Sequence, residues 1–303
     1  MNEFRPVAET CVTGAGGFLG ARIAAALAVA GRRVAAFGRT APPGLDGDMR
    51  AAAWDGRQPA PAGLQVDAVV DCAAAIPSRL PDPDLLIATN VALARNAVDL
   101  AARCAGPLLY MSSQSAIGRP AAATIDDATP PAPDTPYGHS KLAAERLIAA
   151  AVADGLLPWA VALRLPAVIG PGCHDNFPAT VAARLAAGET ITLFNPDGPY
   201  NAVVHADTVA AFVRHLLARP PAGFRAVSLA ARPPIPVRDA VAAIAGGFGT
   251  APRLEVRPAA QASPVIDPSG AVALGFVPDG TRDVLTRYGA EAALRIATPP
   301  PPR

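Results

Sequence analysis

Short apolar runs alternate with longer segments of helical periodicity along the first half of the chain. Runs of strand length occur at 9–13, 32–39, 49–55, 66–74, 106–113 and 158–165. The longer helical segments between them lie at 21–31, 85–104 and 136–153. Strands that are apolar throughout and separated by helices indicate a parallel sheet covered on both faces. The pattern therefore predicts an α/β fold with a Rossmann-type, doubly wound parallel sheet.

The regular alternation ends after Arg164, where proline, glycine and other loop residues increase. Beyond it, only 176–188 and 205–218 have a clear helical pattern, and 225–230 has the pattern of a seventh strand. We expect a dinucleotide-binding domain over 1–165, with 200–230 returning to it. A smaller substrate-binding lobe is predicted from 166–199 and 231–295, and the proline-rich tail 296–303 is predicted to be disordered.

Composition narrows the class of protein. The chain has 303 residues, of which 51% are hydrophobic and 17% charged, so it can bury a large core. A net charge of +1 without a basic run argues against a nucleic-acid partner. Glycines and Arg22 interrupt the apolar stretch at 11–30, which argues against a membrane span there. Four scattered cysteines without a C-x-x-C spacing predict reduced thiols and a cytoplasmic location.

A glycine turn, TGAGGFLG, follows the first strand and opens a helix. Gly14, Gly17 and Gly20 are spaced three residues apart. Small residues let the backbone approach a pyrophosphate, and the helix N-terminus stabilises the phosphate charge. A glycine-rich turn without a ligand is the alternative, but its place between a strand and a helix favours a dinucleotide site.

The end of the second strand bears on the choice of cofactor. A carboxylate there would bind the adenosine ribose hydroxyls and favour NAD. This chain has Gly38 and Arg39 instead, and a guanidinium can pair with a 2′-phosphate. The sequence therefore predicts NADP as the preferred cofactor, with NAD as the alternative. Asp55, after the third strand, is a candidate for the adenine amino group or an ordinary turn aspartate.

Tyr137 and Lys141 form a candidate proton-transfer pair. Thr135 suits the N-cap and Pro136 the first position of a helix, so Tyr137 and Lys141 lie one turn apart on one face. A phenol ordinarily has a pKa near 10, and an adjacent ammonium and an oxidised nicotinamide stabilise its ionised form. A third polar group is predicted from Ser112 and Ser113, which end the fifth strand at the edge where open α/β sheets bind ligands.

These motifs together resemble the extended short-chain dehydrogenase/reductase family, in its NAD-dependent epimerase/dehydratase branch. T-G-x-x-G-x-x-G occupies 13–20, Y-x-x-x-K occupies 137–141, and Gly118 follows Ser113 by five residues. The segments LRLPAVIGPG, NAVVHADTVA and ALGFVP are similar to later motifs of the branch. The resemblance runs from about residue 10 to 290.

The resemblance implies roles for individual residues. Ser113 would be the catalytic serine, Tyr137 the proton donor and Lys141 the residue that binds the nicotinamide ribose. It also implies contacts with the cofactor from Phe18, Leu19, Ala73, Ala74, Asn90 and Pro166. Asn90 has a packing or capping role as its alternative. A substrate pocket is expected between the sheet edge and the lobe, and the candidate contacts are Ala75, Ser113, Asn176, Phe177 and Asn201. Two of these have a structural alternative: Asn176 suits a helix cap, and Phe177 suits a core aromatic.

Departures from the family pattern bear on the reaction. The family's dehydratases have a T-D-E motif after the fifth strand, and its carboxylates help to eliminate water. Here Gln114 and Ser115 follow Ser113, so dehydration is not expected. Ala167 and Ile117 replace residues that assist sugar-nucleotide recognition in many epimerases, which weakens that substrate without removing it. An enzyme moving hydride at a hydroxyl or keto carbon of a sugar nucleotide or similar substrate is predicted. The alternatives are an NADPH-dependent reductase of a non-sugar ketone and a non-catalytic dinucleotide sensor.

Two further expectations concern metal and partners. His174, His205 and Asp207 show no metal-ligand spacing, so no metal site is predicted; His205 and Asp207 are expected to anchor the lobe. Many relatives dimerise through the helices after the fourth and fifth strands. The resemblance therefore implies a homodimer through the alanine-rich segments 85–104 and 136–153, although their apolar faces also suit an ordinary core.

Overall fold

The computed structural model describes residues 9–40, 49–258 and 264–298, and the chain in it forms two compact units, each with its own hydrophobic core. Unit 1 comprises Met1–Gly118, Pro130–Arg164 and Val209–Val227, and unit 2 comprises Arg119–Thr129, Leu165–Thr208 and Ser228–Arg303. The segment 119–129 was expected in the dinucleotide-binding domain. It belongs to unit 2, because β6 within it pairs with β15.

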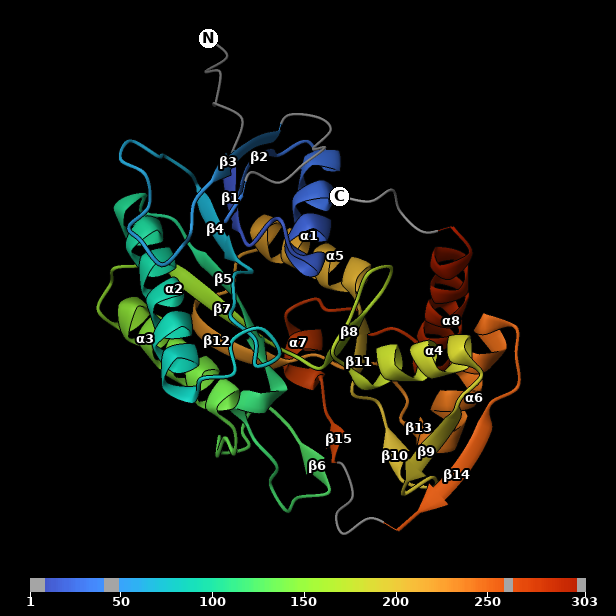
Figure 1. Ribbon diagram of the computed structural model, residues 1–303. Helices are drawn as coiled ribbons and strands as arrows, with labels where there is room; N and C mark the ends of the chain where they lie inside the picture. Colours follow the sequence, from blue (N-terminus) through green and yellow to red (C-terminus); the bar gives the residue numbers. More distant parts are fainter. Residues whose placement is uncertain (1–8, 41–48, 259–263, 299–303) are drawn as a thin grey trace. The chain divides into compact units, whose positions relative to one another are not determined.

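Unit 1 is built on a seven-strand sheet with the order β12-β7-β5-β4-β1-β2-β3 (Figure 1). β1 pairs in parallel with both β2 and β4, so the strand order reverses at β1 and β4, where open sheets bind ligands. This arrangement confirms the predicted doubly wound Rossmann-type sheet. The strands are β1 (Glu9–Thr13), β2 (Arg33–Gly38), β3 (Met49–Ala53), β4 (Ala68–Asp71), β5 (Leu108–Ser113), β7 (Trp159–Leu165) and β12 (Gly223–Ser228).

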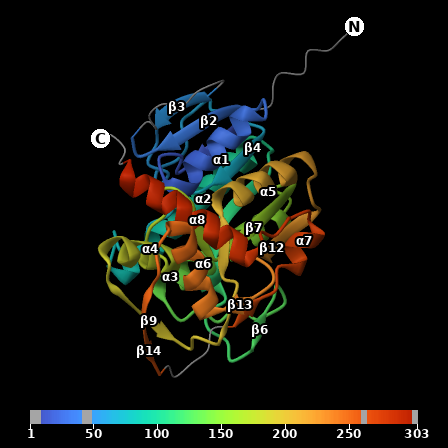
Figure 2. The same cartoon turned by 90° about the vertical axis from the view of Figure 1, so that its right-hand side faces the viewer.

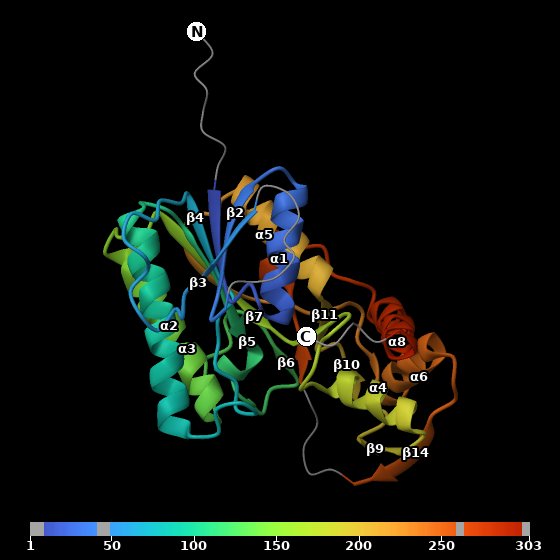
Figure 3. The same cartoon turned by 45° about the horizontal axis from the view of Figure 1, so that its top comes forward.

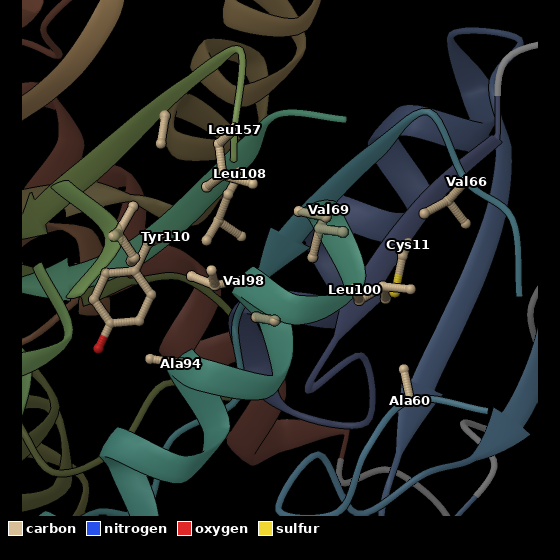
Figure 4. Packing of buried hydrophobic residues seen from close by; sticks show 14 of the residues in the cluster. Cys11, Ala60, Val66, Val69, Ala94, Val98, Leu100, Leu108, Tyr110 and Leu157 are labelled. Carbon is tan, nitrogen blue, oxygen red and sulfur yellow. The ribbon is translucent and has the colours of Figure 1, made fainter. Parts of the chain in front are cut away.

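Helices cover both faces of this sheet (Figures 1 and 3). α2 (Pro83–Arg103) and α3 (Pro136–Ala153) pack together on one face, and α1 (Phe18–Val29) and α5 (Ala206–Ala218) lie on the other. Beneath α2 and α3, the sheet contributes Cys11, Val69 and Tyr110 to a buried cluster (Figure 4). Among the described helices, α2 alone is long and apolar enough to cross a membrane, and its apolar face here is part of this core.

Unit 2 combines short two-strand sheets with four helices. β8 pairs with β11, β9 with β14 and β6 with β15 in parallel, and β10 pairs with β13 antiparallel. Its elements are β6 (Thr124–Ile125), β8 (Ala167–Ile169), α4 (Phe177–Ala187), β9 (Thr190–Phe194), β10 (Pro199–Tyr200), β11 (Val203–His205), β13 (Ile235–Pro236), α6 (Val237–Phe248), β14 (Arg253–Arg257), β15 (Val265–Ile266), α7 (Ser269–Ala273) and α8 (Thr281–Ala297).

α6 and α8 pack side by side in unit 2 (Figure 2) and were not expected from the sequence. A glycine of each helix lies against the backbone of the other. A Cβ on Gly247 would lie 1.9 Å from the main-chain oxygen of Thr286, and a Cβ on Gly289 would lie 2.1 Å from that of Ile244. The absence of a side chain at these two glycines therefore allows the backbones of α6 and α8 to approach closely.

The C-terminal boundary also differs from the prediction. α8 continues to Ala297, so the first residues of the expected disordered tail are helical. Leu294 and Ile296 remain exposed on this last turn. The remainder of the predicted tail, 299–303, lies outside the described residues.

Candidate active site

The glycine turn after β1 brings the backbone of the turn against the end of β4. Gly14 has φ +62°, a left-handed conformation that favours glycine, and a Cβ there would lie 2.7 Å from the main-chain carbon of Cys72. Gly20 is also closely approached, because its Cβ would lie 2.3 Å from the oxygen of Gly14. The main-chain N–H of Gly17 donates to that same oxygen at 2.9 Å.

The start of α1 has the properties of an anion site. Gly17 is its N-cap, and no side chain caps the first turn, which contains Phe18, Leu19 and Gly20. The first N–H groups of a helix lack partners within the helix and attract negative charge. Gly16 faces open space where a side chain would stand. The turn therefore fits a pyrophosphate, and the predicted residues lie together on it.

The edge at which the sequence predicts cofactor selection is formed by the ends of β2 and β3. Gly38 is in register with Ala53, so Arg39 and Asp55 follow neighbouring parallel strands at the same edge. Arg39 is exposed. Asp55 accepts two hydrogen bonds from Arg57, which hold the pKa of its carboxyl below its usual range. Two guanidiniums and one carboxylate thus share this edge, and Arg57 was not anticipated from the sequence.

The first turn of α3 is held against the end of β5. Thr135 caps the helix by accepting the N–H of Gly138 at 3.1 Å, and Pro136 occupies its first position, as predicted. A Cβ on Gly138 would lie 2.2 Å from the main-chain oxygen of Ser115. The missing side chain therefore allows the turn that carries Tyr137 to approach η1 (Gln114–Ala116), which follows Ser113 directly.

The Lys141 ammonium is buried beside two tyrosines. Its Nζ donates to the main-chain oxygen of Met111 at 2.8 Å and lies 5.6 Å from the ring centroid of Tyr137 and 4.7 Å from that of Tyr110. Burial works to lower the pKa of Lys141, but the combined influence of Tyr110, Tyr137 and Asp71 outweighs it and raises the pKa. The ammonium is thus held charged beside the partly exposed Tyr137.

The two serines at the end of β5 have different environments. Ser113 is half-buried, and its Oγ accepts only the N–H of Ser115, at 3.2 Å, as the N-cap of η1. Its hydroxyl proton is available to another acceptor. Ser112 is buried and donates to Oε1 of Glu145 at 2.6 Å. Glu145 pairs in turn with Arg164. The geometry thus leaves Ser113, and not Ser112, as the candidate substrate contact.

Asn90 joins the loop after β4 to α3. Its Oδ1 accepts the N–H of Ala75 at 2.7 Å, and its Nδ2 donates to the Ala75 oxygen and to Oγ of Ser140. Ser140 donates to the main-chain oxygen of Tyr137 at 2.7 Å. The amide is therefore used by the protein itself, and it fixes the loop that contains the predicted contacts Ala73, Ala74 and Ala75.

The predicted substrate contacts in unit 2 have bonds within their own unit. Asn176 caps α4 by accepting the N–H of Ala179 at 2.9 Å, and Phe177 packs edge-on against Tyr200. Asn201 is buried, and its amide bonds to Ala231 and twice to Ile266. These bonds give Asn176 and Asn201 structural roles. Pro166, between β7 and β8, is half-buried.

His205 and Asp207 attach β11 and the start of α5 to α8 within unit 2. Nδ1 of His205 accepts the N–H of Asp207 at 3.1 Å, so Nε2 carries the proton and donates to Glu291 at 3.0 Å. Asp207 also pairs with Arg287. Within the described ranges, no group of three or more potential ligands gathers into a metal site. The four cysteines form no disulfide.

Three residues of unit 1 near the predicted site were missed, although the sequence held a signal for each. Glu145 lies one turn beyond Lys141 and two turns beyond Tyr137, on the same helix face. Asp71 is an acid at the end of an otherwise apolar strand. Arg57 comes two residues after Asp55. All three are charged residues, and each lies on a sheet edge or helix face that the sequence pattern already predicted to belong to the site.

Comparisons with known proteins bear on the family and the fold of the chain. A family model described as the NAD dependent epimerase/dehydratase family matches residues 10–229. The 2′-dehydrokanamycin reductase of Streptomyces kanamyceticus is 33% identical over 163 residues, which are 52% of this chain and 46% of that protein, so the match spans less than half of its length.

Solved structures share the fold. UDP-glucuronic acid 4-epimerase from Bacillus cereus, in complex with NAD, is 17% identical with a TM-score of 0.81, over 94% of this chain and 96% of that one. RMD from Pseudomonas aeruginosa, complexed with NADPH, is 22% identical with a TM-score of 0.76, over 95% and 100%. With the family model covering most of the chain, the protein belongs to the NAD dependent epimerase/dehydratase family of enzymes.

Proposed function

We propose that this enzyme moves hydride between a nicotinamide dinucleotide and a hydroxyl or keto carbon of a sugar nucleotide or similar substrate, with Tyr137 as the acid/base. The observation that carries the proposal is the position of Lys141. Its ammonium is buried, charged and 5.6 Å from the Tyr137 ring centroid, while the Ser113 hydroxyl ends the adjacent strand. A buried cation beside a partly exposed phenol favours proton transfer at that phenol.

Each residue has a separate task in this proposal. Tyr137 gives a proton to the substrate oxygen during reduction and takes it back during oxidation. Ser113 donates a hydrogen bond to the same oxygen, because its hydroxyl proton is not used by Ser115. Lys141 stabilises the ionised phenol and binds the ribose hydroxyls. A bound nicotinamide would supply or accept the hydride.

NADP is the cofactor that the chain's own residues favour. Arg39 is exposed at the end of β2, where an NAD enzyme of this fold commonly has a carboxylate. A guanidinium offers paired donors to a 2′-phosphate, and Arg57 lies at the same edge. The fold itself accepts either cofactor, because the two solved relatives hold NAD and NADPH.

Net reduction is the direction that this cofactor favours, and the relative that is 33% identical is named a reductase. A sugar epimerase is the second candidate, since the structural relative with TM-score 0.81 is a UDP-sugar 4-epimerase. An epimerase has to retain its cofactor and return the hydride, whereas a reductase releases the cofactor at each turnover. A reductase acting on a non-sugar ketone would use the same residues.

Assembly and location complete the proposal. We expect a homodimer formed through α2 and α3, as the family resemblance implies, and Leu85 of α2 is exposed for such a contact. The four unpaired cysteines agree with a cytoplasmic location. Light scattering of the purified protein measures its oligomeric state, and a monomer would contradict the proposed homodimer.

The decisive experiment is titration of the purified protein with NADPH and with NADH, followed by nicotinamide fluorescence, after any copurified cofactor has been identified. Tight and freely exchanging NADPH supports the reductase. Retained NAD with little response to NADPH would overturn the role of Arg39 and make the cofactor-recycling epimerase the better reading. If the protein binds neither NADPH nor NADH, both the reductase and the epimerase proposals are contradicted.

A further inference from the structure

Three polar side chains lie in a row across the sheet of unit 1, at the carboxyl ends of its central strands. Thr13 of β1 is in register with Asp71 of β4, and Asp71 is in register with Tyr110 of β5. Register partners in a parallel sheet present their side chains on the same face. Figure 4 shows Tyr110 on the face covered by α2, with Val69 of β4 and Cys11 of β1 on the same face.

Asp71 is buried and its two oxygens are used unequally. The residue is 1% exposed. Its Oδ1 accepts the hydroxyl of Thr13 and the N–H of Ala73, at 3.2 Å in the latter case. Its Oδ2 has no hydrogen-bond partner among the described residues. A buried carboxylate with a free oxygen is costly unless a positive charge compensates it.

The Lys141 ammonium is a positive charge that acts on Asp71. It lies 4.7 Å from the ring centroid of Tyr110, the register neighbour of Asp71, and donates to the carbonyl of Met111 on the same strand as Tyr110. Neighbouring strands are about 4.8 Å apart, so the ammonium is close to the carboxyl end of β4. Burial raises the pKa of Asp71, while the Thr13 hydrogen bond and the Lys141 charge oppose that rise.

We propose that Asp71 is the counter-charge of the Lys141 ammonium and, through it, a positioning residue for the Tyr137–Lys141 pair. The carboxylate holds the ammonium charged before any cofactor is bound. It also offsets part of the field that the ammonium exerts on the Tyr137 phenol. The effect of Asp71 on proton transfer at Tyr137 rests on the proposed function. The charge pairing between Asp71 and Lys141 does not.

The other groups around Asp71 leave Lys141 as its compensating cation. Cys11 comes from β1, Tyr110 from β5 and Cys72 from the residue that follows β4. Burial raises the pKa of all three, so they are neutral near pH 7. The buried polar residue of α2 is Asn90, an uncharged amide already bonded to Ala75 and Ser140. From α3, the Lys141 ammonium acts on the Asp71 carboxyl and lowers its pKa.

The first test measures the ionisation of Tyr137 without substrate or cofactor. Tyrosinate absorbance is titrated in the wild type and in Asp71→Asn, and the corresponding Tyr137→Phe protein is subtracted from each. Loss of the carboxylate removes a negative charge that opposes ionisation. We therefore expect the midpoint of the Tyr137-dependent signal to move to lower pH by about one unit. Equal midpoints would overturn the proposal.

Asp67→Asn is the matched control. Asp67 directly precedes β4 at its opposite end, and it pairs with Arg32 at 2.9 Å. The substitution removes the same charge from the same strand, but far from Lys141. We expect the midpoint to stay at the wild-type value. A shift as large as that of Asp71→Asn would show a general charge effect and would contradict a specific pairing.

A second test keeps the proposal falsifiable if Asp71→Asn does not fold. In Lys141→Met, Asp71 loses its counter-charge, so its folded-state pKa rises further above the unfolded value near 4. The folded state then binds more protons than the unfolded state, and stability falls as pH rises between those values. We expect the denaturation midpoint of Lys141→Met to fall progressively relative to wild type as the pH rises above about 4, the unfolded-state pKa of an aspartate.

The double variant Asp71→Asn/Lys141→Met should lose this extra pH dependence. Parallel stability curves for the wild type and Lys141→Met would overturn the counter-charge. Neither stability measurement uses a substrate or a cofactor. If the proposed reaction is wrong, the stability result for Asp71 and Lys141 still stands. If the Asp71–Lys141 pairing is wrong, the reaction is still tested by the cofactor titration.

Discussion

Glu145 and Arg164 form an ion pair inside unit 1, with Nη2 of Arg164 2.9 Å from Oε2 of Glu145 and side chains that are 4% and 6% exposed. Ser112 also donates a hydrogen bond to Oε1 of this carboxylate. The pair joins α3 to both β5 and β7, two turns along the helix from Tyr137. Because water cannot replace either partner, removal of one leaves the other charge buried and uncompensated.

Glu145→Gln is therefore expected to lower the free energy of unfolding by about 3–5 kcal/mol, measured by denaturant unfolding. The matched control is Asp239→Asn in unit 2, where Asp239 pairs with Arg282 at 2.8 Å on the surface. That substitution should change stability by less than about 1 kcal/mol. Similar losses in the two variants would contradict the importance of burial.

Tyr137→Phe removes the hydroxyl that we propose transfers the proton, and it keeps the ring beside Lys141. We expect kcat to fall by about 10²–10⁴-fold, with the Kd for the cofactor unchanged. Turnover is followed through nicotinamide absorbance with a panel of keto sugars and nucleotide sugars. Tyr200→Phe, which removes a half-buried hydroxyl of unit 2, is the control that should retain activity. Full activity in Tyr137→Phe would reject the acid/base role.

Arg39→Ala tests the choice of cofactor. A charged hydrogen bond contributes about 1.5–3 kcal/mol, so the Kd for NADPH should rise by about ten- to a hundredfold while that for NADH stays within about twofold. Arg33→Ala removes a cation at the amino end of the same strand and should change neither value. Equal weakening of both cofactors would mean that Arg39 does not contact the 2′-phosphate.

Gly138→Ala tests the close approach of α3 to η1. The new methyl group would lie 2.2 Å from the oxygen of Ser115, so the helix turn or the serine loop has to shift. We expect a loss of about 1–3 kcal/mol in stability and a fall of about 10²-fold in kcat, because Tyr137 and Ser113 move apart. Wild-type kcat in this variant would show that their spacing is tolerant.

Gly246 and Gly247 are adjacent in α6 and should respond in opposite directions to alanine. Gly246 has open space around it, so Gly246→Ala should raise the free energy of unfolding by about 0.5–1 kcal/mol. Gly247→Ala should lower it by about 1–3 kcal/mol, because the methyl group meets the backbone of Thr286. Thermal unfolding of the two variants compares them directly; stabilisation by both would refute the tight α6–α8 contact.

Unit 1 was predictable because its elements carry strong local patterns. The strands are apolar throughout, and Thr135 and Pro136 mark the start of α3 before any contact is known. Parallel strands end at one edge, so Gly14, Ser113 and Arg39 were placed at the same edge from the sequence. Lys141 was placed on the face of Tyr137 from helical spacing alone.

Unit 2 was less predictable because its stability depends on contacts between distant segments. Gly247 and Gly289 weaken the helical pattern of α6 and α8, and only their mutual packing explains them. The sequence could not decide whether Asn176 caps a helix; the structure shows that it caps α4 by accepting the N–H of Ala179. Burial of Asp71 likewise depends on three strands and a helix, which no single sequence window contains.

The chain of bonds from Ala75 through Asn90 and Ser140 to Tyr137 has a kinetic consequence. A dinucleotide that orders the loop at Ala75 also orders the first turn of α3, because one buried amide bonds to both. On the proposed function, binding of the cofactor would therefore set the Tyr137 phenol in place before the substrate binds. We expect an ordered sequence of binding, with the cofactor entering before the substrate and leaving after the product.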